Sequence, residues 1–233
     1  VAGPQSREVL RAAGCDVDLD SDSFPFMSMR EGEIGGVPSR ISRISFSGEL
    51  AFEISVNANY GMTLWQTIMD AGRAYNITPY GTEAMHVLRA EKGYVIVGQD
   101  TDGSVTPNDL GMDWIVSQNK DFIGKRSLFR SDTARSNRKQ LVGLLTDNSK
   151  IALPEGAQLV NSPQNSRPVP MIGHVSSSYY SASLGRSIAL ALVKGGRTRM
   201  GSTIFAQLMD DQIVPAVIVD PVFYDPDNAR SKL

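Results

Sequence analysis

The sequence predicts an α+β protein in which helices pack on an antiparallel sheet and an antiparallel β-barrel follows. The first half alternates strand-like and helix-like segments, whereas the region after residue 139 contains only short strand-like segments. Between the two halves, residues 130–139 carry four positive charges and no apolar periodicity. We therefore expect a first domain over residues 1–129 and a barrel domain over residues 139–233, joined by a solvated linker.

The elements of the first domain are marked by apolar periodicity and by turn residues. We expect a helix over 1–14, strands over 24–34 and 37–56 around a Gly35-Gly36 turn, helices over 61–72 and 82–92, and a short buried strand over 94–98. Trp65, Ile68, Met69 and Gly72 recur at helical spacing within residues 61–72. Thr82 can cap the last helix and Gly93 can end it.

The segment from Ile44 to Val56 alternates apolar and polar residues, which indicates a strand with one buried face. Glu49 and Glu53 would then share its polar face. A carboxylate fixed in direction by a core-anchored strand can accept hydrogen bonds from a ligand with paired N–H donors. The alternative from periodicity alone is two solvated glutamates on an exposed strand face.

Strand-like segments at short spacing, separated by turn residues such as Gly195-Gly196 and Asp210-Asp211, predict an antiparallel barrel or sandwich of about six strands in the second half. The six segments cover residues 140–146, 157–160, 171–176, 187–193, 203–209 and 213–219.

Composition excludes several classes of function. Hydrophobic residues make up 41% of the chain, charged residues 21%, and the net charge is −2, so nothing indicates binding to nucleic acid or to a membrane. The single cysteine, Cys15, favours a reducing, cytoplasmic location. The first residues show neither a signal-peptide pattern nor an initiator methionine, and we expect the chain to be cut from a longer protein.

Candidate metal and nucleophile chemistry is weak. The two histidines, His86 and His174, lie far from each other and from Cys15 in sequence, and we expect structural or surface roles for both. The run Asp100-Thr101-Asp102-Gly103 has only part of a calcium-loop pattern. From these isolated residues we predict no metal site. Neither a dinucleotide fingerprint nor a phosphate-binding loop is present, so we also predict no flavin or nucleotide site in this chain.

A series of ordered motifs resembles the glycine-cleavage T-protein (aminomethyltransferase) family over nearly the whole chain. They are Ala2-Gly3-Pro4, Phe46-Ser47-Gly48-Glu49 through Phe52-Glu53-Ile54, Leu88-Arg89-Ala90-Glu91-Lys92-Gly93, Gly98-Gln99-Asp100, Asp121-Phe122-Ile123-Gly124-Lys125, Ile172-Gly173-His174-Val175-Ser176-Ser177 and Asp220-Pro221-Val222-Phe223-Tyr224-Asp225-Pro226. Each motif alone is weak, and their common order makes the resemblance specific. It implies a partial T-protein-like, folate-binding domain followed by the barrel.

Within that family, the runs from Gly81 to Arg89 and from Leu184 to Arg197 are most similar to the C-terminal part of the sarcosine oxidase alpha subunit. The resemblance implies that tetrahydrofolate captures the one-carbon unit of sarcosine oxidation as 5,10-methylenetetrahydrofolate. It also implies the other sarcosine oxidase subunits as partners, with FAD or FMN and NAD bound outside this chain.

The resemblance places the pterin-recognising carboxylate of the family on Glu53 and its aromatic partner on Phe46, which lacks the usual tyrosine hydroxyl. Arg89 and Tyr94 complete the expected folate-binding set, although Arg89 could equally pair with a carboxylate such as Glu83 and Tyr94 could belong to the core. The arginine expected near the glutamyl tail of folate is replaced by Met85. The catalytic aspartate would lie upstream of Val1, so we assign no catalytic residue and expect the chain alone to be inactive.

Three readings remain open. The first is the sarcosine oxidase module, and the second is the same module of a dimethylglycine dehydrogenase or of a stand-alone aminomethyltransferase. Met85 and His86 disfavour a stand-alone aminomethyltransferase. The third is a non-catalytic folate-binding or assembly domain that serves as a scaffold, which Phe46 and Met85 favour.

Overall fold

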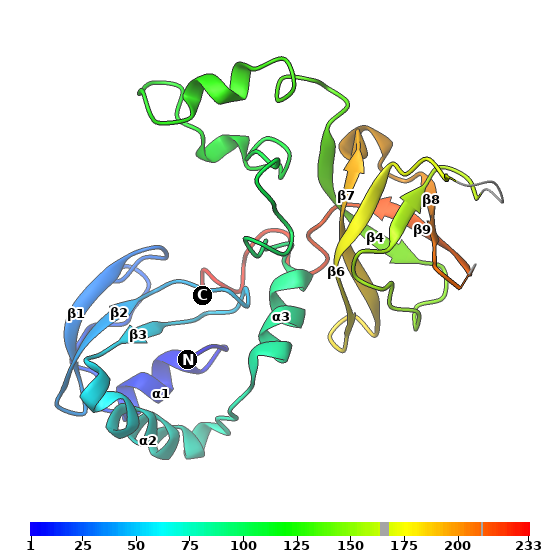
Figure 1. Cartoon of the computed structure of the whole chain (residues 1–233). Helices are drawn as coiled ribbons and strands as arrows, with labels where there is room; N and C mark the ends of the chain where they lie inside the picture. Colours follow the sequence, from blue (N-terminus) through cyan, green and yellow to red (C-terminus); the bar gives the residue numbers. More distant parts are fainter. Residues whose placement is uncertain (164–167, 211) are drawn as a thin grey trace. The chain divides into compact units, whose positions relative to one another are not determined.

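A computed structural model describes residues 1–163, 168–210 and 212–233, so Asp211 of the predicted Asp210-Asp211 turn lies outside the described residues. The chain divides into two compact units. Unit 1 comprises Val1–Arg89 together with Asp225–Leu233, and unit 2 comprises Ala90–Tyr224. Figure 1 shows the helices and sheet of unit 1 and the barrel strands of unit 2. The predicted fold class, helices with an antiparallel sheet followed by an antiparallel barrel, is confirmed.

Unit 1 is built on a three-stranded antiparallel sheet in the order β1-β2-β3. Strand β1 (Met29–Ile34) returns into β2 (Val37–Ser42) through Gly35 and Gly36, which have φ values of 57° and 77°. Two consecutive positive φ values match the twist of a two-residue hairpin and are accessible to glycine without strain. The short strand β3 (Glu53–Ser55) pairs with β2, with Glu53 opposite Ser42.

The predicted strand over 37–56 is wrong in its middle, because residues 43–52 form a loop between β2 and β3. The side chain of Arg43 turns into the interior and is 2% exposed, and Gly48 adopts a φ of 83° that a strand cannot accommodate. Leu50 and Phe52 are buried from this loop, which explains why the apolar alternation continues there without a strand. Glu49 and Glu53 therefore do not share a strand face.

Three α-helices follow the predicted order, the second with its predicted bounds and the first and third shorter than predicted. Helix α1 spans Ser6–Ala12, α2 spans Gly61–Gly72 and α3 spans Thr82–Glu91. Short 3-10 turns cover Ala58–Tyr60, Arg73–Tyr75, Asp113–Ile115, Lys125–Phe129 and Gly196–Arg199. The core of unit 1 joins Leu10 of α1 and Leu64 of α2 to Ile34 and Ile41 of the sheet. Burial of these side chains fixes the helices against the strands.

Unit 2 contains a closed six-stranded antiparallel barrel, as predicted, and its strand order is β4-β7-β6-β5-β8-β9. The strands are β4 (Lys139–Thr146), β5 (Gln158–Val160), β6 (Gly173–Ser181), β7 (Arg186–Lys194), β8 (Thr203–Gln207) and β9 (Ile213–Val219). Closure leaves no unpaired sheet edge.

Strand β7 shows how the barrel residues are arranged. Ala189, Ala191 and Val193 belong to the main barrel core, whereas the alternating Ile188, Leu190 and Leu192 belong to a second cluster. That cluster includes Ala90, Leu141 and the partly buried Phe223. Both faces of β7 are therefore covered by apolar side chains within unit 2, which explains its continuous hydrophobic sequence.

The predicted strand over 94–98 is not formed. Residues 96–100 instead make a tight turn in which the buried Asp100 side chain accepts the Ile96 N–H at 2.9 Å. A carboxylate that accepts a backbone N–H gives the backbone an alternative to strand pairing. In this turn the Val97 side chain is 87% exposed and not buried as a strand residue would be.

The division into compact units falls inside α3, between Arg89 and Ala90. This position differs from the predicted linker at 130–139, where β4 begins at Lys139 and the preceding Arg138 side chain is only 11% exposed. The domain limits 1–129 and 139–233 stay a prediction.

Candidate ligand-binding site

Unit 1 contains an open cavity of about 810 Å³. Its wall comes from the start of the chain, from β3, from α2 and from the segment that follows the 3-10 turn at Arg73–Tyr75. The lining residues are 1–6 and Val9, 52–56, Gly61, Leu64, Trp65, Ile68 and Met69, and 75–80. A cavity of this size matches a ligand with several rings, because drug-sized ligands occupy roughly 300–1,000 Å³.

The chain start forms one wall of this cavity because it pairs with the loop before β3. Ala2 bridges Ala51 in antiparallel fashion, the Val1 nitrogen donates to the Phe52 carbonyl at 2.8 Å, and the Phe52 N–H donates back at 2.9 Å. Gly3 N–H donates to the Leu50 carbonyl at 2.8 Å. These backbone bonds place residues 50–53 next to the first turn of α1.

Glu53 opens strand β3 and lies on the cavity wall with an exposed side chain. Its exposed carboxylate oxygens can accept hydrogen bonds, which suits a ligand edge that carries N–H donors.

Aromatic side chains line the same cavity. Trp65 on α2 is 56% exposed and Tyr80 is 52% exposed, while Tyr75 is half-buried. The buried residues of α2 are Leu64 and Gly72. Trp65 follows Leu64 directly and is turned about 100° from it around the helix, which leaves the Trp65 side chain exposed.

The other predicted folate-binding residues lie elsewhere. Phe46 is half-buried in the loop 43–52 and does not line the cavity. Arg89 is completely buried near the end of α3, and Tyr94 is half-buried in unit 2. Met85 and His86 lie on α3 and are half-buried. The structure thus brings only Glu53 of the predicted set to the cavity, and folate contact by the other three stays a prediction.

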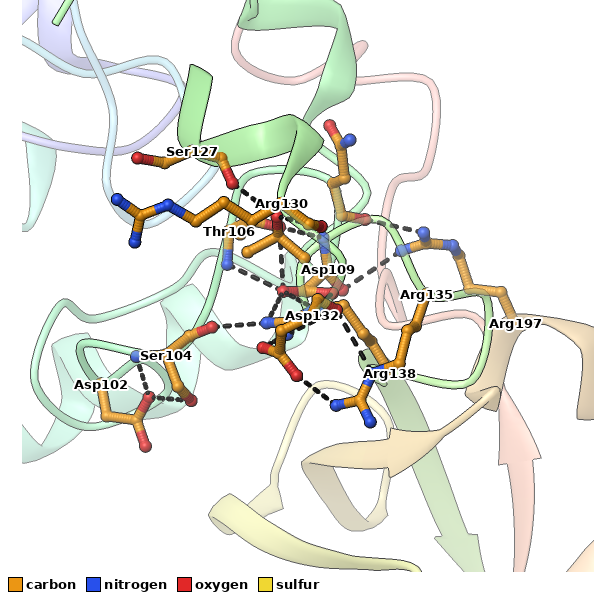
Figure 2. Close-up of polar contacts among 12 residues, drawn as sticks. Asp102, Ser104, Thr106, Asp109, Ser127, Arg130, Asp132, Arg135, Arg138 and Arg197 are labelled. Carbon is orange, nitrogen blue, oxygen red and sulfur yellow. Dashed lines mark hydrogen bonds and ion pairs between the residues drawn. The ribbon is translucent and has the colours of Figure 1, made fainter. Parts of the chain in front are cut away.

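A second polar arrangement lies within unit 2 and is centred on Asp109 (Figure 2). Arg138 donates from Nε to Oδ1 at 2.9 Å and from Nη2 to Oδ2 at 2.7 Å, and its Nη1 contacts Asp132 at 2.8 Å. Thr106 donates to the same Asp109 carboxylate through its N–H and its hydroxyl. Arg197 binds the backbone carbonyls of Asn108 and Asp109.

Burial would raise the pKa of Asp109, but hydrogen bonds from Arg138 and Thr106 outweigh burial and hold that pKa below its usual value. The donors satisfy both carboxylate oxygens, and the Asp109 side chain is 5% exposed. The arrangement connects the loop before residue 112 to the beginning of β4. We interpret it as a hydrogen-bonded network that stabilises the fold, and not as a ligand site.

His174 on β6 lies beside the first residue of β4, with its Nδ1 3.3 Å from the Lys139 ammonium. Burial lowers the pKa of His174, the Lys139 charge lowers it further, and Asp102 opposes both. The ammonium can only donate, so Nδ1 accepts and the neutral ring carries its proton on Nε2. This pair gives His174 a partner on β4, and its structural or surface role stays a prediction.

Within the described residues, no group of three or more His, Cys, Asp or Glu side chains is arranged to hold a metal ion. None of the helices in the described part of the chain is both long and apolar enough to cross a membrane.

Comparison with known families divides the chain near the predicted linker. Residues 1–120 match the GCVT N-terminal domain, and residues 139–225 match the glycine cleavage T-protein C-terminal barrel domain. Aminomethyltransferase T from Bartonella henselae has a similar fold, with a TM-score of 0.78 at 24% identity over 95% of this chain and 57% of that structure.

Curated relatives include three kinds of protein. The sarcosine oxidase subunit alpha of Corynebacterium sp. strain U-96 is 48% identical over 99% of this chain and 24% of its own length. The aminomethyltransferase of Thermotoga neapolitana is 32% identical over 82% of this chain and 49% of its own length. Human mitochondrial dimethylglycine dehydrogenase is 31% identical over the whole chain and 26% of its own length.

This chain therefore spans about a quarter of the length of its sarcosine oxidase relatives. The two family matches follow one another in the order of the two predicted domains, and the first alone covers more than half of the chain. The chain belongs to the glycine-cleavage T-protein family.

Proposed function

We propose that this chain is the tetrahydrofolate-binding portion of a sarcosine oxidase alpha subunit, which takes up the one-carbon unit of sarcosine as 5,10-methylenetetrahydrofolate. The observation that carries the proposal is the unit 1 cavity, in which the Glu53 carboxylate and the aromatic side chains of Trp65, Tyr75 and Tyr80 line one space. Identities of 48% and 37% with two sarcosine oxidase alpha subunits support this reading over the dimethylglycine dehydrogenase reading, at 31%.

The chemistry of the lining residues fits a reduced pterin. Its amino-pyrimidine edge presents N–H donors, which an ionised carboxylate accepts through charge-assisted hydrogen bonds. Its rings and the aminobenzoyl group need apolar, flat surfaces, which aromatic side chains provide. When bound, tetrahydrofolate supplies the amines that accept the one-carbon unit.

In this proposal the residues of the chain bind and orient the folate. Glu53 fixes the position of the pterin edge, and Trp65 and Tyr80 shield the rings from water. We assign no proton transfer to residues 1–233. FAD or FMN, NAD, the other sarcosine oxidase subunits and a cytoplasmic location belong to the same proposal, with the flavin and the dinucleotide outside this chain.

Calorimetric titration of tetrahydrofolate into the complete polypeptide that the gene encodes tests the role of Glu53. Glu53→Gln keeps the shape but removes the charge, and loss of a charge-assisted contact worth about 1.5–3 kcal/mol should weaken binding roughly tenfold to a hundredfold. Glu33→Gln is the matched control, because Glu33 is an exposed glutamate on β1 of the same sheet and does not line the cavity. Equal affinities of wild type and Glu53→Gln would remove Glu53 from the site.

The same titration separates the alternative functions. A scaffold domain predicts that the wild-type protein does not bind tetrahydrofolate at all. If the protein binds folate, comparison of sarcosine with dimethylglycine as oxidised substrate of the assembled enzyme distinguishes the oxidase from the dehydrogenase. Formation of methylenetetrahydrofolate by the separate chain, measured against the unassisted condensation of formaldehyde, should not exceed the control.

A further inference from the structure

The last nine residues, Asp225–Leu233, follow the barrel in sequence but belong to unit 1. This segment, which we call the C-terminal strap, is ordered by its own turn. The Asp225 carboxylate accepts the N–H groups of Ala229 and Arg230 at 3.0 and 3.3 Å, and the Ser231 hydroxyl donates to the Asn228 carbonyl. The strap thus presents a defined set of side chains to the first eighty-nine residues.

Two arginines of unit 1 hold the end of the strap. Arg43 is 2% exposed and donates to the carbonyls of Phe24 and Leu233, each at 2.7 Å. Arg7 on α1 donates to the Leu19 carbonyl at 2.7 Å and also to that of Leu233. Both guanidinium groups join the strap to residues that are far away in sequence, so the strap is part of the folded unit and not a free tail.

One strap residue reaches the loop 43–52 by an ion pair. Arg230 donates from Nε to Glu49 Oε1 at 2.5 Å, and the side chains are 38% and 21% exposed. The other oxygen, Glu49 Oε2, is buried and has no hydrogen-bond partner among the described residues. Glu49 therefore depends on Arg230 for compensation of its charge, and loss of Arg230 would favour movement of the carboxylate toward water.

Glu49 is directly followed by residues that shape the cavity. The Leu50 carbonyl accepts the N–H of Gly3 and, at 3.0 Å, the hydroxyl of Ser6, and both of these residues line the cavity. Phe52 exchanges two backbone hydrogen bonds with Val1, and Glu53 follows at once. A shift of Glu49 would thus be transmitted over four residues to the predicted pterin-binding carboxylate.

We propose that Arg230 is a positioning residue for the unit 1 cavity, acting through its ion pair with Glu49 to fix the loop that carries Glu53. The proposal rests on the proposed folate function, because the ligand used to measure the effect is tetrahydrofolate. Arg230 itself does not line the cavity. Its role is to hold the loop 43–52 in the position at which the chain start and β3 form a continuous wall.

The test compares six complete polypeptides, of which the first four are wild type, Arg230→Met, Glu49→Gln and the double variant. Either single change should weaken tetrahydrofolate binding roughly three- to tenfold. The double variant should be no weaker than the single ones, since both remove the same interaction. Arg230→Lys keeps the charge and should recover part of the affinity. Arg11→Met is the matched control, because Arg11 is 46% exposed and pairs on the surface with Glu8 and Asp20.

Hydrogen exchange supplies a readout that does not need the ligand. Amides of residues 45–52 should exchange faster in Arg230→Met than in Arg11→Met, while the melting temperatures of the two variants stay similar. Unchanged exchange in this segment, or unchanged affinity in both single variants when the wild type binds, would overturn the positioning role alone. A wild-type protein that does not bind tetrahydrofolate would overturn the proposed function, and the positioning role would fall with it.

Discussion

Strand β7 of the barrel and strand β3 of unit 1 differ in how far their side chains are buried. The central residues of β7 are buried on both faces, and the barrel to which it belongs has no free edge. Strand β3 has only three residues, pairs with β2 on one side, and exposes Glu53 and Ser55 at a cavity. The barrel is closed around its own core, whereas in unit 1 β3, α2 and residues 75–80 line an open cavity with polar and aromatic side chains.

The polar groups of the two units differ in the same way. In unit 2, Asp109 has donors on both carboxylate oxygens and is held by the neighbouring segments. In unit 1, Glu53 faces an open cavity with its carboxylate exposed. Asp109 is thus an internally paired charge, whereas a binding role for the exposed Glu53 carboxylate stays a proposal.

The largest effect that tests this contrast is expected at Arg138. Arg138→Met would leave the Asp109 carboxylate, which is 5% exposed, without its bidentate partner. Breaking a buried ion pair from one side costs about 3–5 kcal/mol, because an uncompensated charge remains in the interior. Urea unfolding monitored by circular dichroism measures this loss.

Arg135→Met provides the control for this prediction. Arg135 is 58% exposed and pairs with Asp132 on the surface, so its removal should change the unfolding free energy by less than about 1 kcal/mol. Asp109→Asn in the Arg138→Met background should recover part of the stability. A loss below about 1 kcal/mol for Arg138→Met would show that Asp109 is not a buried structural charge.

The sequence was sufficient to predict the barrel because strand periodicity is a local property. The alternation of Ala189, Ala191 and Val193 with Ile188 and Leu190 is present in the sequence itself. All six barrel strands overlap their predicted positions, although β6 runs on to Ser181 from a predicted end at residue 176, and α2 has its predicted limits. Each of these elements buries a face that its own residues define.

The loop 43–52 was predicted as a strand because apolar and polar residues alternate along it. This alternation reflects the burial of its apolar side chains, although the loop is not paired as a strand. Leu50 and Phe52 are buried, but the loop is held by backbone bonds to residues 1–3 and by Arg230, which lies 181 positions away from Glu49. Contacts of such separation leave no periodic signal in a single sequence. The same holds for the cavity, since its wall combines the chain start, β3, α2 and residues 75–80.

A smaller effect is expected when an aromatic cavity residue is removed. Trp65→Ala should weaken tetrahydrofolate binding about two- to tenfold, in keeping with about 0.5–1.5 kcal/mol for an aromatic contact. It should change stability by no more than about 0.5 kcal/mol, because Trp65 is 56% exposed. The only other tryptophan, Trp114, is 79% exposed outside the cavity, so Trp114→Ala is the control for affinity and for ligand-induced fluorescence quenching. Quenching that survives in Trp65→Ala but disappears in Trp114→Ala would contradict the proposed cavity.

The smallest effect concerns pH and returns to unit 2. Burial first, and the Lys139 charge second, lower the pKa of His174 in the folded protein below its ordinary value near 6.5. The unfolded chain therefore binds a proton at His174 more readily than the folded chain does. Stability from this site is complete above about pH 6.5 and is lost as the pH falls from there toward the lower folded pKa.

The unfolding free energy should therefore decrease more from about pH 7.5 to about pH 5.5 in wild type than in His174→Gln, because glutamine does not titrate. Lys139→Met removes the neighbouring positive charge and should raise the pKa of His174, so its decrease should lie between the other two. NMR titration of the His174 ring gives the folded pKa directly, and His86→Gln serves as the control for the second histidine. An equal decrease in wild type and His174→Gln would mean that burial beside Lys139 does not keep this imidazole neutral.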